Sequence, residues 1–141
     1  MVVDEPAQRT GRTVVVDGNN VIGAVADGWW RDRPAAVRRL LGRLQCYGRR
    51  SGHEVLLVLD VAQADLPTGD HDGVEVRYAT RRGRNAADDA IVELLASRSF
   101  PGAVEVVTSD RALVTAARST PPRPDVIGAR TFLTRLDAAG C

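Results

Sequence analysis

The sequence predicts an α/β fold, a three-layer α/β/α sandwich around a central parallel sheet of four to five strands. Short apolar runs rich in β-branched residues alternate along the chain with stretches of helical periodicity, an order typical of parallel sheets. The length of 141 residues suits one domain of ordinary size. We therefore expect a flexible tail over residues 1–12 and a single domain over residues 13–141.

Four segments have the pattern of strands that are covered by helices. They are apolar runs, or alternate apolar with polar residues, and turn formers follow them. The expected strands are residues 13–17, 54–60, 74–79 and 104–108, with residues 125–128 as a candidate fifth strand. Between the second and third strands, residues 63–73 are rich in Pro, Gly and Asp and predict a polar loop.

Four helices are expected between and after these strands, over residues 34–48, 86–98, 111–119 and 129–138. In the first of them, Val37, Leu40, Leu41 and Leu44 share one face. Pro34 is well placed at its first turn, where the missing amide hydrogen is not needed. Asn85 is a candidate cap for the second helix.

The charged residues exclude several classes of site. The formal charge is only +1, so contact with nucleic acid requires a local basic patch. Every basic residue is arginine, which excludes chemistry that depends on lysine, including that of receiver domains. A haloacid-dehalogenase-like phosphatase needs Asp-x-Asp where this chain has Asp17, Gly18 and Asn19. The G-x-G-x-x-G turn of dinucleotide-binding folds is also absent.

The cellular location and the state of the cysteines are predicted from sequence patterns that the chain lacks. No apolar run approaches the roughly 20 residues of a membrane span, and the first residues lack the pattern of a secretory signal. We therefore expect a cytoplasmic protein that does not contact membranes. Cys46 and Cys141 are far apart in sequence and match no metal-binding spacing, so they are expected to be unpaired thiols.

Acidic residues follow the expected strands in a regular way. Asp17, Asp60 and Asp110 stand at or just after three strand ends. The carboxyl ends of parallel strands share one edge of the sheet, where ligands bind, so these carboxylates should gather there. Asp88 falls in the first turn of the helix that follows the third strand, on the side of that helix that faces the sheet. Asp89 falls on the opposite, solvent side and is expected to support it.

Several carboxylates gathered at one edge cannot all stay ionised unaided. A divalent cation would relieve the conflict, and an all-oxygen ligand set favours Mg²⁺ or Mn²⁺. Such a metal ion would lower the pKa of a bound water and stabilise a phosphoryl transition state. The candidate metal ligands are Asp17, Asp60, Asp88 and Asp110. The alternative is that these aspartates only cap helices and form turns.

Four segments carry a resemblance to a known family. In chain order, VVVDGNNVIGA, VLLVLD, NAADDAIVELL and VVTSDRAL resemble the YacP-like branch of the NYN domain family, within the PIN-like nucleases. The resemblance runs from about Thr13 onwards. It implies a PIN-like, Rossmann-like sheet whose acidic residues bind Mg²⁺ or Mn²⁺ to cut RNA. Some YacP-like members act on messenger RNA at the ribosome.

Carried over by motif, the resemblance implies catalytic roles for individual residues. Asp17, Asp88 and Asp110 would be the metal-binding acids, and Asp60 matches less securely. Asn19 and Asn20 would orient the site or the scissile phosphate, with Asn20 taking part in catalysis. The supporting residues are Asn19, Asp89 and Ser109.

RNA contacts are expected from two basic segments that lie near the predicted site. One is the loop before the helix of Asp88, because the arginine fork suits phosphate. The other contains a tryptophan that would stack on a base of single-stranded RNA. The candidate RNA-binding residues are Arg81, Arg82, Arg84, Trp30, Arg31 and Arg33.

The sequence therefore predicts an endoribonuclease, dependent on Mg²⁺ or Mn²⁺, that hydrolyses single-stranded RNA, with messenger RNA on the ribosome as a candidate substrate. The alternative is a non-catalytic module of the same fold that binds RNA or a ribosomal surface. Nothing in the sequence decides between a monomer and a homodimer.

Overall fold

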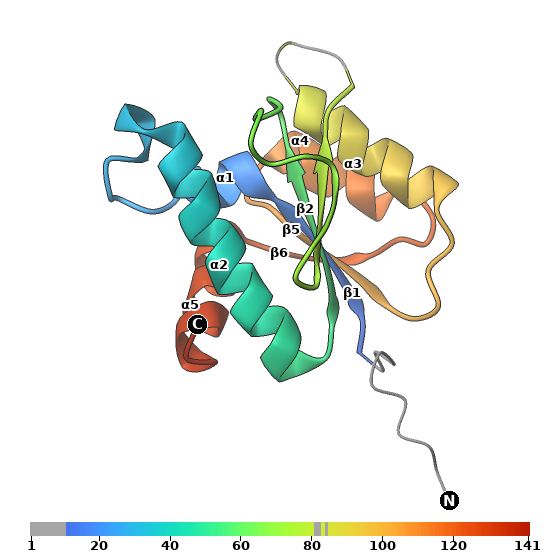
Figure 1. Cartoon of the computed structure of the whole chain (residues 1–141). Coiled ribbons are helices and arrows are strands. Elements are labelled where there is room, and N and C mark those ends of the chain that lie inside the picture. Colours follow the sequence, from blue (N-terminus) through green and yellow to red (C-terminus); the bar gives the residue numbers. More distant parts are fainter. Residues whose placement is uncertain (1–10, 81–82, 84) are drawn as a thin grey trace, which may run out of the picture.

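A six-stranded sheet forms the centre of the computed structural model, which describes residues 11–80, 83 and 85–141 (Figure 1). The strand order is β3-β4-β2-β1-β5-β6, and all neighbours are parallel except the β3–β4 pair. The strands are β1 (Thr13–Asp17), β2 (Glu54–Leu59), β3 (Gly69–His71), β4 (Val74–Tyr78), β5 (Val104–Val107) and β6 (Asp125–Ile127). The predicted α/β class is confirmed, with an antiparallel edge strand added to the expected parallel sheet.

Five helices and one short 3₁₀ helix, η1, surround the sheet within the described residues. They are α1 (Gly18–Gly23), η1 (Trp29–Arg31), α2 (Arg33–Ser51), α3 (Ala86–Ser97), α4 (Arg111–Arg118) and α5 (Ala129–Ala138). Helices α1, α2 and α5 cover one face, and α3 and α4 cover the other (Figure 1). None of the described helices is both long and apolar enough to span a bilayer.

The central strands are buried on both faces, which explains their continuous apolar runs. In β1, Val14 and Val16 pack toward α2 and α5, whereas Val15 packs toward α3 and α4. All three are fully buried, as are Phe132 of α5 and Ile91 of α3. Because successive side chains of a strand point to opposite faces of the sheet, neighbouring residues of β1 enter two separate hydrophobic cores.

Helix α1 begins directly after β1, so the chain passes from strand to helix without a loop. Sequence reasoning missed this helix because its residues, GNNVIG, have poor helix propensity. Gly18 lets the turn pack closely on β2: a Cβ there would lie 2.6 Å from Leu59 Cδ2 and 3.0 Å from the Val58 carbonyl oxygen. The backbone of the following asparagines is thereby held close to the strand ends.

Substitution of Gly18 by alanine is expected to lower the free energy of unfolding by about 1–3 kcal/mol, because the added methyl group overpacks the contact with β2. Urea unfolding measures the loss. Gly23→Ala is the matched control, since a Cβ at Gly23 meets nothing within 4 Å, and it should leave stability unchanged or slightly raised. Equal stabilities for the two variants would contradict this account of Gly18.

The predicted loop over residues 63–73 contains the edge strand β3, which corrects the sequence interpretation. Two of its three residues, Gly69 and Asp70, belong to types that are depleted in strands. The strand forms through backbone pairing with β4 and through Gln45 Nε2 of α2, which donates to the His71 carbonyl oxygen at 2.9 Å. Its shortness is common for an exposed edge.

Two helix ends differ in detail from expectation. Helix α2 is longer than predicted: the side chain of Asp32 accepts from the Ala35 amide at 3.1 Å, and Gly52, at φ 74°, ends the helix. Asn85 precedes α3 as predicted, but it has φ 67° and makes no capping hydrogen bond through its side chain. Its role there is conformational, because asparagine tolerates the left-handed region.

A buried ion pair joins α5 to the centre of the sheet. Glu105 of β5 is 2% exposed, and its two carboxylate oxygens accept from Arg135 Nη1 at 2.7 Å and Nη2 at 3.1 Å. The paired carboxylate raises the pKa of Arg135 above its usual value. Such a two-point pair fixes orientation as well as charge. It therefore sets how α5 lies on the sheet.

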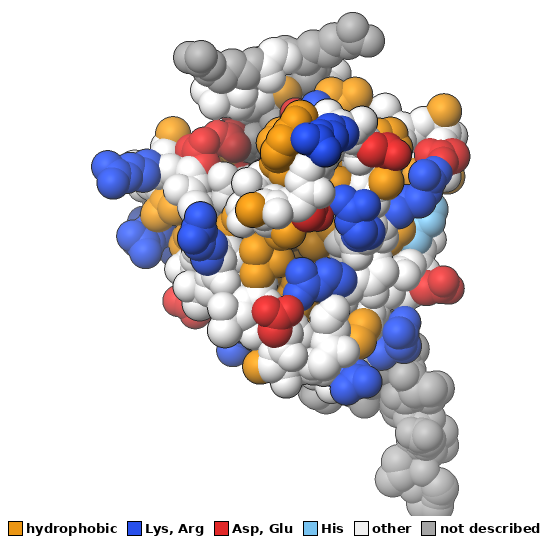
Figure 2. Space-filling model, turned by 90° about the vertical axis from the view of Figure 1, so that its left-hand side faces the viewer, with side chains coloured by type: hydrophobic (Ala, Val, Ile, Leu, Met, Phe, Trp, Pro, Cys, Tyr) orange, Lys and Arg blue, Asp and Glu red, His pale blue; other side chains and the backbone are white. Residues whose placement is uncertain are grey.

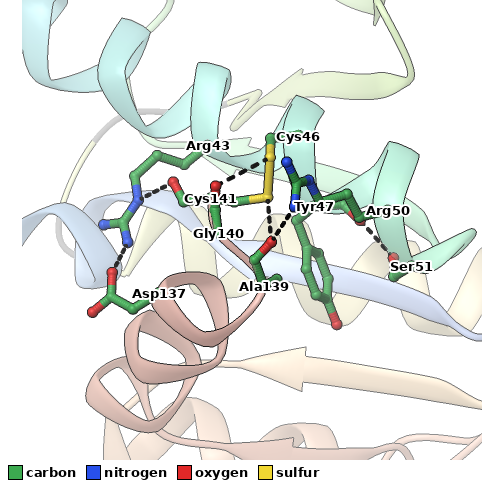
Figure 3. The surroundings of a disulfide bond; sticks show 9 residues. All are labelled: Arg43, Cys46, Tyr47, Arg50, Ser51, Asp137, Ala139, Gly140 and Cys141. Carbon is green, nitrogen blue, oxygen red and sulfur yellow. Dashed lines mark hydrogen bonds and ion pairs between the residues drawn. A yellow bond between two sulfur atoms is a disulfide. The ribbon is translucent and has the colours of Figure 1, made fainter.

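A disulfide joins α2 to the end of the chain, so the prediction of two unpaired thiols is wrong. Cys46 and Cys141 are bonded, with their Cα atoms 5.7 Å apart (Figure 3). The pairing escaped sequence reasoning because 95 residues separate the two cysteines, and only the packing of α5 beside α2 brings them together.

Polar contacts around the disulfide hold the same two segments together (Figure 3). Arg43 of α2 donates to the Cys141 carbonyl oxygen at 3.1 Å and pairs with Asp137 at 2.6 Å. Arg50 Nη1 donates to the Ala139 carbonyl oxygen at 3.1 Å. The end of the chain is therefore tied to α2 by arginine side chains on both sides of the covalent bond.

Candidate active site

Asp17, the last residue of β1, is the most deeply buried acid at the carboxyl edge of the sheet. It is 4% exposed, and its Oδ2 accepts from the Thr108 hydroxyl at 2.8 Å. Burial raises the pKa of Asp17 to about 6, against the lowering effect of the Thr108 hydrogen bond, and the nearby charges of Asp88 and Asp110 raise it further. A buried carboxylate with like charges nearby favours a bound cation or a proton.

Thr108 links two of the acids through one hydroxyl group. Besides donating to Asp17, its Oγ1 accepts from the backbone amide of Asp110 at 3.1 Å. Asp110 in turn caps α4, with Oδ1 accepting from the Leu113 amide at 3.1 Å. Sequence reasoning did not select Thr108, although a hydroxyl residue directly after a strand and before Ser-Asp was the available signal.

Asp88 and Asp89 lie in the first turn of α3, and both are half-buried. Burial raises the pKa of Asp88 to about 6, and the charges of Asp110 and Asp89 add to the rise. The supporting role expected for Asp89, on the solvent side of the helix, stays a prediction. On the same first turn, Ala86 and Ala87 are buried.

Asn19 and Asn20 connect the end of β1 to its two neighbouring strands. Asn19 Oδ1 accepts from the Asp60 amide after β2 at 2.9 Å, and Asn20 Oδ1 accepts from the Ser109 amide after β5 at 2.7 Å. The Ser109 hydroxyl then accepts from the Ala129 amide at 2.8 Å. These bonds use the carbonyl oxygens of the two asparagine side chains.

Asp60 has a different partner from the other strand-end acids. Its carboxylate pairs with Arg33 Nη2 at 3.2 Å, and its charge is not among the causes of the raised pKa values of Asp17 and Asp88. The structure thus brings Asp17, Asp88 and Asp110 together and places Asp60 against the start of α2. The assignment of Asp60 as a metal ligand stays a prediction.

Asp17, Asp88 and Asp110 offer only carboxylate oxygens to a metal ion. Within the described part of the chain, no group of three or more His, Cys, Asp or Glu side chains is converged tightly enough to form a ready ligand set. The chemistry of the donors nevertheless fits a hard divalent cation: the ligands are all carboxylate oxygens, and their mutual repulsion is the kind that a bound cation relieves.

The predicted RNA-binding residues fall into two groups. Arg81, Arg82 and Arg84 lie outside the described residues. In η1, Trp30 is 61% exposed, with its ring edge-to-face with Trp29 at 6.0 Å and the Arg31 guanidinium 5.8 Å from its centre. Arg33 forms an ion pair with Asp60.

Hollows lie on either side of the Asn19–Asn20 turn. One, of about 470 Å³, is lined mainly by polar groups, among them Asn20, Ser109, Arg130 and Thr131. The other, of about 290 Å³, lies between the end of β2 and the start of α2. Farther from the acids, an apolar depression between α1, α2 and α5 is bordered by arginines, on the face that Figure 2 presents.

Comparison with solved structures supports the fold. A single-residue mutant of Rae1 (YacP) from Bacillus subtilis has a TM-score of 0.75 at 22% identity, and the match covers 92% of this chain and 77% of that one. A second crystal structure of Rae1 (YacP) from Bacillus subtilis has a TM-score of 0.69 at 24% identity, and the match covers 91% of this chain and 75% of that one.

Comparison of the sequence with protein families identifies the domain. The profile of the YacP-like NYN domain matches residues 14–139, which span every strand and helix described above except the first residue of β1. The comparison with curated proteins gave no significant match. The chain therefore belongs to the YacP-like NYN domain family, whose superfamily is one of ribonuclease-type nucleases.

Proposed function

We propose that this protein is a metal-dependent endoribonuclease that hydrolyses phosphodiester bonds in single-stranded RNA. The observation that carries the proposal is the placement of Asp17, Asp88 and Asp110. They come from β1, α3 and the β5–α4 turn, and their charges act on one another at the carboxyl edge of the sheet. Membership of the YacP-like NYN family supports the same reaction class.

Asp17, Asp88 and Asp110 would hold Mg²⁺ or Mn²⁺. When bound, the ion supplies an activated water and stabilises negative charge at the phosphorus. Thr108 helps to fix the orientation of Asp17 by donating to Oδ2, and the backbone of Asn20 also hydrogen-bonds this carboxylate. Asp89 adds negative charge beside Asp88, and the cap of α4 holds Asp110 through a single carboxylate oxygen.

Other groups at this edge suit the RNA strand. The NH₂ groups of Asn19 and Asn20 are donors that fit phosphate oxygens. Arg111 and Arg130 are exposed on either side of Ser109 and make no side-chain ion pair with the described residues, so both are available to the backbone of the strand. Exposed Trp30 supplies a stacking surface for an unpaired base, and Arg81, Arg82 and Arg84 are further proposed phosphate contacts.

The proposal is tested by cleavage of a labelled single-stranded RNA with Mn²⁺, Mg²⁺ or EDTA. Wild-type protein should cut only with metal, and Asp88→Asn should slow cutting by about 100-fold or more, because loss of one ligand removes several kcal/mol of transition-state stabilisation. Asp125→Asn is the matched control, since Asp125 is exposed at the amino end of β6. Cleavage that persists in EDTA, or in Asp88→Asn at the wild-type rate, would contradict the proposal.

A binding module for RNA or a ribosomal surface is the second candidate function. It is favoured by the absence of a converged ligand set among the described acids. It predicts RNA binding that survives in Asp88→Asn and no cleavage under any condition. Adding translating ribosomes to the assay separates the two: cleavage of messenger RNA that appears only with ribosomes identifies a ribosome-dependent enzyme.

A further inference from the structure

The polar hollow between α1 and α5, hereafter the Asn20 hollow, lies at the carboxyl ends of β1 and β5. These neighbouring strands are followed by helices on opposite faces of the sheet, α1 on one face and α4 on the other. Open α/β sheets bind their ligands at such a point. The volume of the hollow, about 470 Å³, falls within the range of ligand pockets, roughly 300–1,000 Å³.

The Asn20 hollow begins directly beside the candidate acids. Ser109, in its wall, directly precedes Asp110 in the chain, and Asn20 lies three residues after Asp17. The walls are joined to one another, because Asn20 Oδ1 accepts from the Ser109 amide at 2.7 Å and the Ser109 hydroxyl accepts from the Ala129 amide at 2.8 Å. A group bound in the hollow is therefore next to a strand that is held at the acids.

The charge of the Asn20 hollow favours an anion. Among the described residues that line it, Arg130 is the only charged one. It is exposed and makes no side-chain ion pair with the described part of the chain. Asn20, Ser109 and Thr131 add an amide and two hydroxyl groups, all of which can donate hydrogen bonds. An arginine fork among such donors is typical of phosphate binding.

The opposite side of the acidic edge has a different charge balance. There, the charged residues that line the hollow between β2 and α2 are all paired, Arg33 with Asp60 and Asp65 with Arg38. A polyanion gains affinity from cations that protein carboxylates have not already neutralised. The backbone of an RNA strand is therefore expected to continue from the acids across the Asn20 hollow.

The lining of the Asn20 hollow also indicates which part of a nucleotide it accepts. Gly23, Ala24 and Gly128 contribute little side chain, and a Cβ at Gly23 would meet nothing within 4 Å. None of the described lining residues is aromatic, whereas proteins usually hold the bases of unpaired RNA by stacking them on aromatic rings. The hollow thus suits a ribose and its phosphate and does not distinguish one base from another.

We propose that the Asn20 hollow binds the ribose-phosphate unit next to the scissile phosphate, with Arg130 paired to the oxygens of that unit's phosphate. The inference rests on the proposed function and adds to it a subsite that holds the strand whatever its base. Arg130 is a binding residue in this arrangement, because it holds the strand and takes no part in breaking the phosphodiester bond.

The test measures, by fluorescence anisotropy in EDTA, the binding of a labelled single-stranded RNA at several salt concentrations. At about 50 mM salt, Arg130→Ala should bind about three- to tenfold more weakly than wild type, and the slope of log K against log salt concentration should become shallower by about 0.7, the value for one phosphate contact on a single strand. The loss should be the same for oligo-A, oligo-C and oligo-U, because phosphate contacts carry no sequence information.

Arg118→Ala is the matched control for the removal of one positive charge. Arg118 is also exposed, but it lies in the last turn of α4, at the far end of that helix from Asp110. Its loss should weaken binding by less than about twofold and leave the salt slope unchanged. Equal effects of the two variants, or an unchanged slope in Arg130→Ala, would overturn the subsite. A loss confined to one of the three oligonucleotides would overturn its indifference to the base.

NMR of ¹⁵N-labelled protein in EDTA locates the contact and identifies the ligand. The dinucleotide UpU, which contains one phosphodiester, should shift the amide signals of Gly23, Ala129 and Arg130, whereas uridine should not. Uridine shifts of the same size would overturn the requirement for phosphate. Inorganic phosphate that shifts these signals as strongly as UpU at equal concentration would show a site for free phosphate in place of an RNA subsite.

The binding measurements contain no metal, so they stand apart from the test of cleavage. RNA binding that depends on Arg130, without cutting in Mn²⁺ or Mg²⁺, would keep the subsite and remove the nuclease. If the protein cuts RNA, Arg130→Ala should raise KM with little change in kcat, the result of losing an interaction that is equal in the ground state and the transition state. A fall in kcat at unchanged KM would contradict the role of Arg130 in binding.

Discussion

Asp17→Asn is expected to abolish RNA cleavage and, at the same time, to make the metal-free protein more stable. Cleavage should fall by about 100-fold or more, because the most buried candidate ligand is lost. Stability should rise because the wild-type carboxylate is held in a buried site near Asp88 and Asp110. The amide of asparagine removes the charge and can still accept the Thr108 hydrogen bond.

The size and pH dependence of this gain follow from the pKa of Asp17. Its folded pKa of about 6 lies above the ordinary 3.8, so the folded state holds the proton more tightly and ionisation destabilises it. The penalty is absent below about pH 4, grows as the pH rises to about 6, and is complete above that. A rise of about two units corresponds to about 3 kcal/mol.

Urea unfolding in EDTA at several values between pH 4 and pH 8 measures this dependence. The advantage of Asp17→Asn over wild type should vanish at the acid end of the range and reach its full size at pH 8. Asp125→Asn, on the opposite edge of the sheet, should show no such dependence. An Asp17→Asn protein that is less stable than wild type at pH 8 would contradict the picture of a strained carboxylate.

Arg135→Ala is expected to cost about 3–5 kcal/mol of unfolding free energy, because it leaves the buried carboxylate of Glu105 without its two-point partner. Arg12, with Nη1 3.5 Å from Glu105 Oε2, remains beside it. Lost contacts of the guanidinium with Tyr47 at 3.5 Å and with the ring of Phe132 add to the effect. The loss is measured by urea unfolding at neutral pH.

Two further variants decide whether the buried charge is the cause. Arg130→Ala removes an exposed arginine from the same helix and should change stability by less than about 0.5 kcal/mol. Adding Glu105→Gln to Arg135→Ala should recover part of the loss, since the unpaired charge is then gone. If the double variant is no more stable than Arg135→Ala, lost packing rather than charge dominates.

The sheet was predictable because burial on both faces requires continuous runs of apolar residues in the central strands. Val14, Val15 and Val16 are consecutive apolar residues, and each packs into one of the two cores. Helix α1 and strand β3 have no such apolar pattern. Their residues have low propensity for the structures they adopt, and backbone contacts with β2 and β4 determine both elements. Tertiary context overrides propensity in short segments of this kind.

The candidate site was predictable as far as topology determines it. Parallel strands bring Asp17 and Asp110 to one edge, and the following helix adds Asp88, whereas their catalytic roles stay predictions. The partners of these side chains were not predictable. Arg33 reaches Asp60 from the start of a helix 27 residues away, and Thr108 bonds Asp17 across 91 residues. Such pairings depend on side-chain geometry that no local pattern records.

The bond between Cys46 and Cys141 gives the molecule the covalent topology of a ring with a linear arm. Every strand except β1 lies within the ring, which is closed by two cysteines 95 positions apart in the sequence. A single cut of the backbone anywhere inside it, for example by a protease at the exposed residues Val61 and Ala62, would open the ring without releasing a fragment. The two pieces would stay one molecule until the disulfide is reduced.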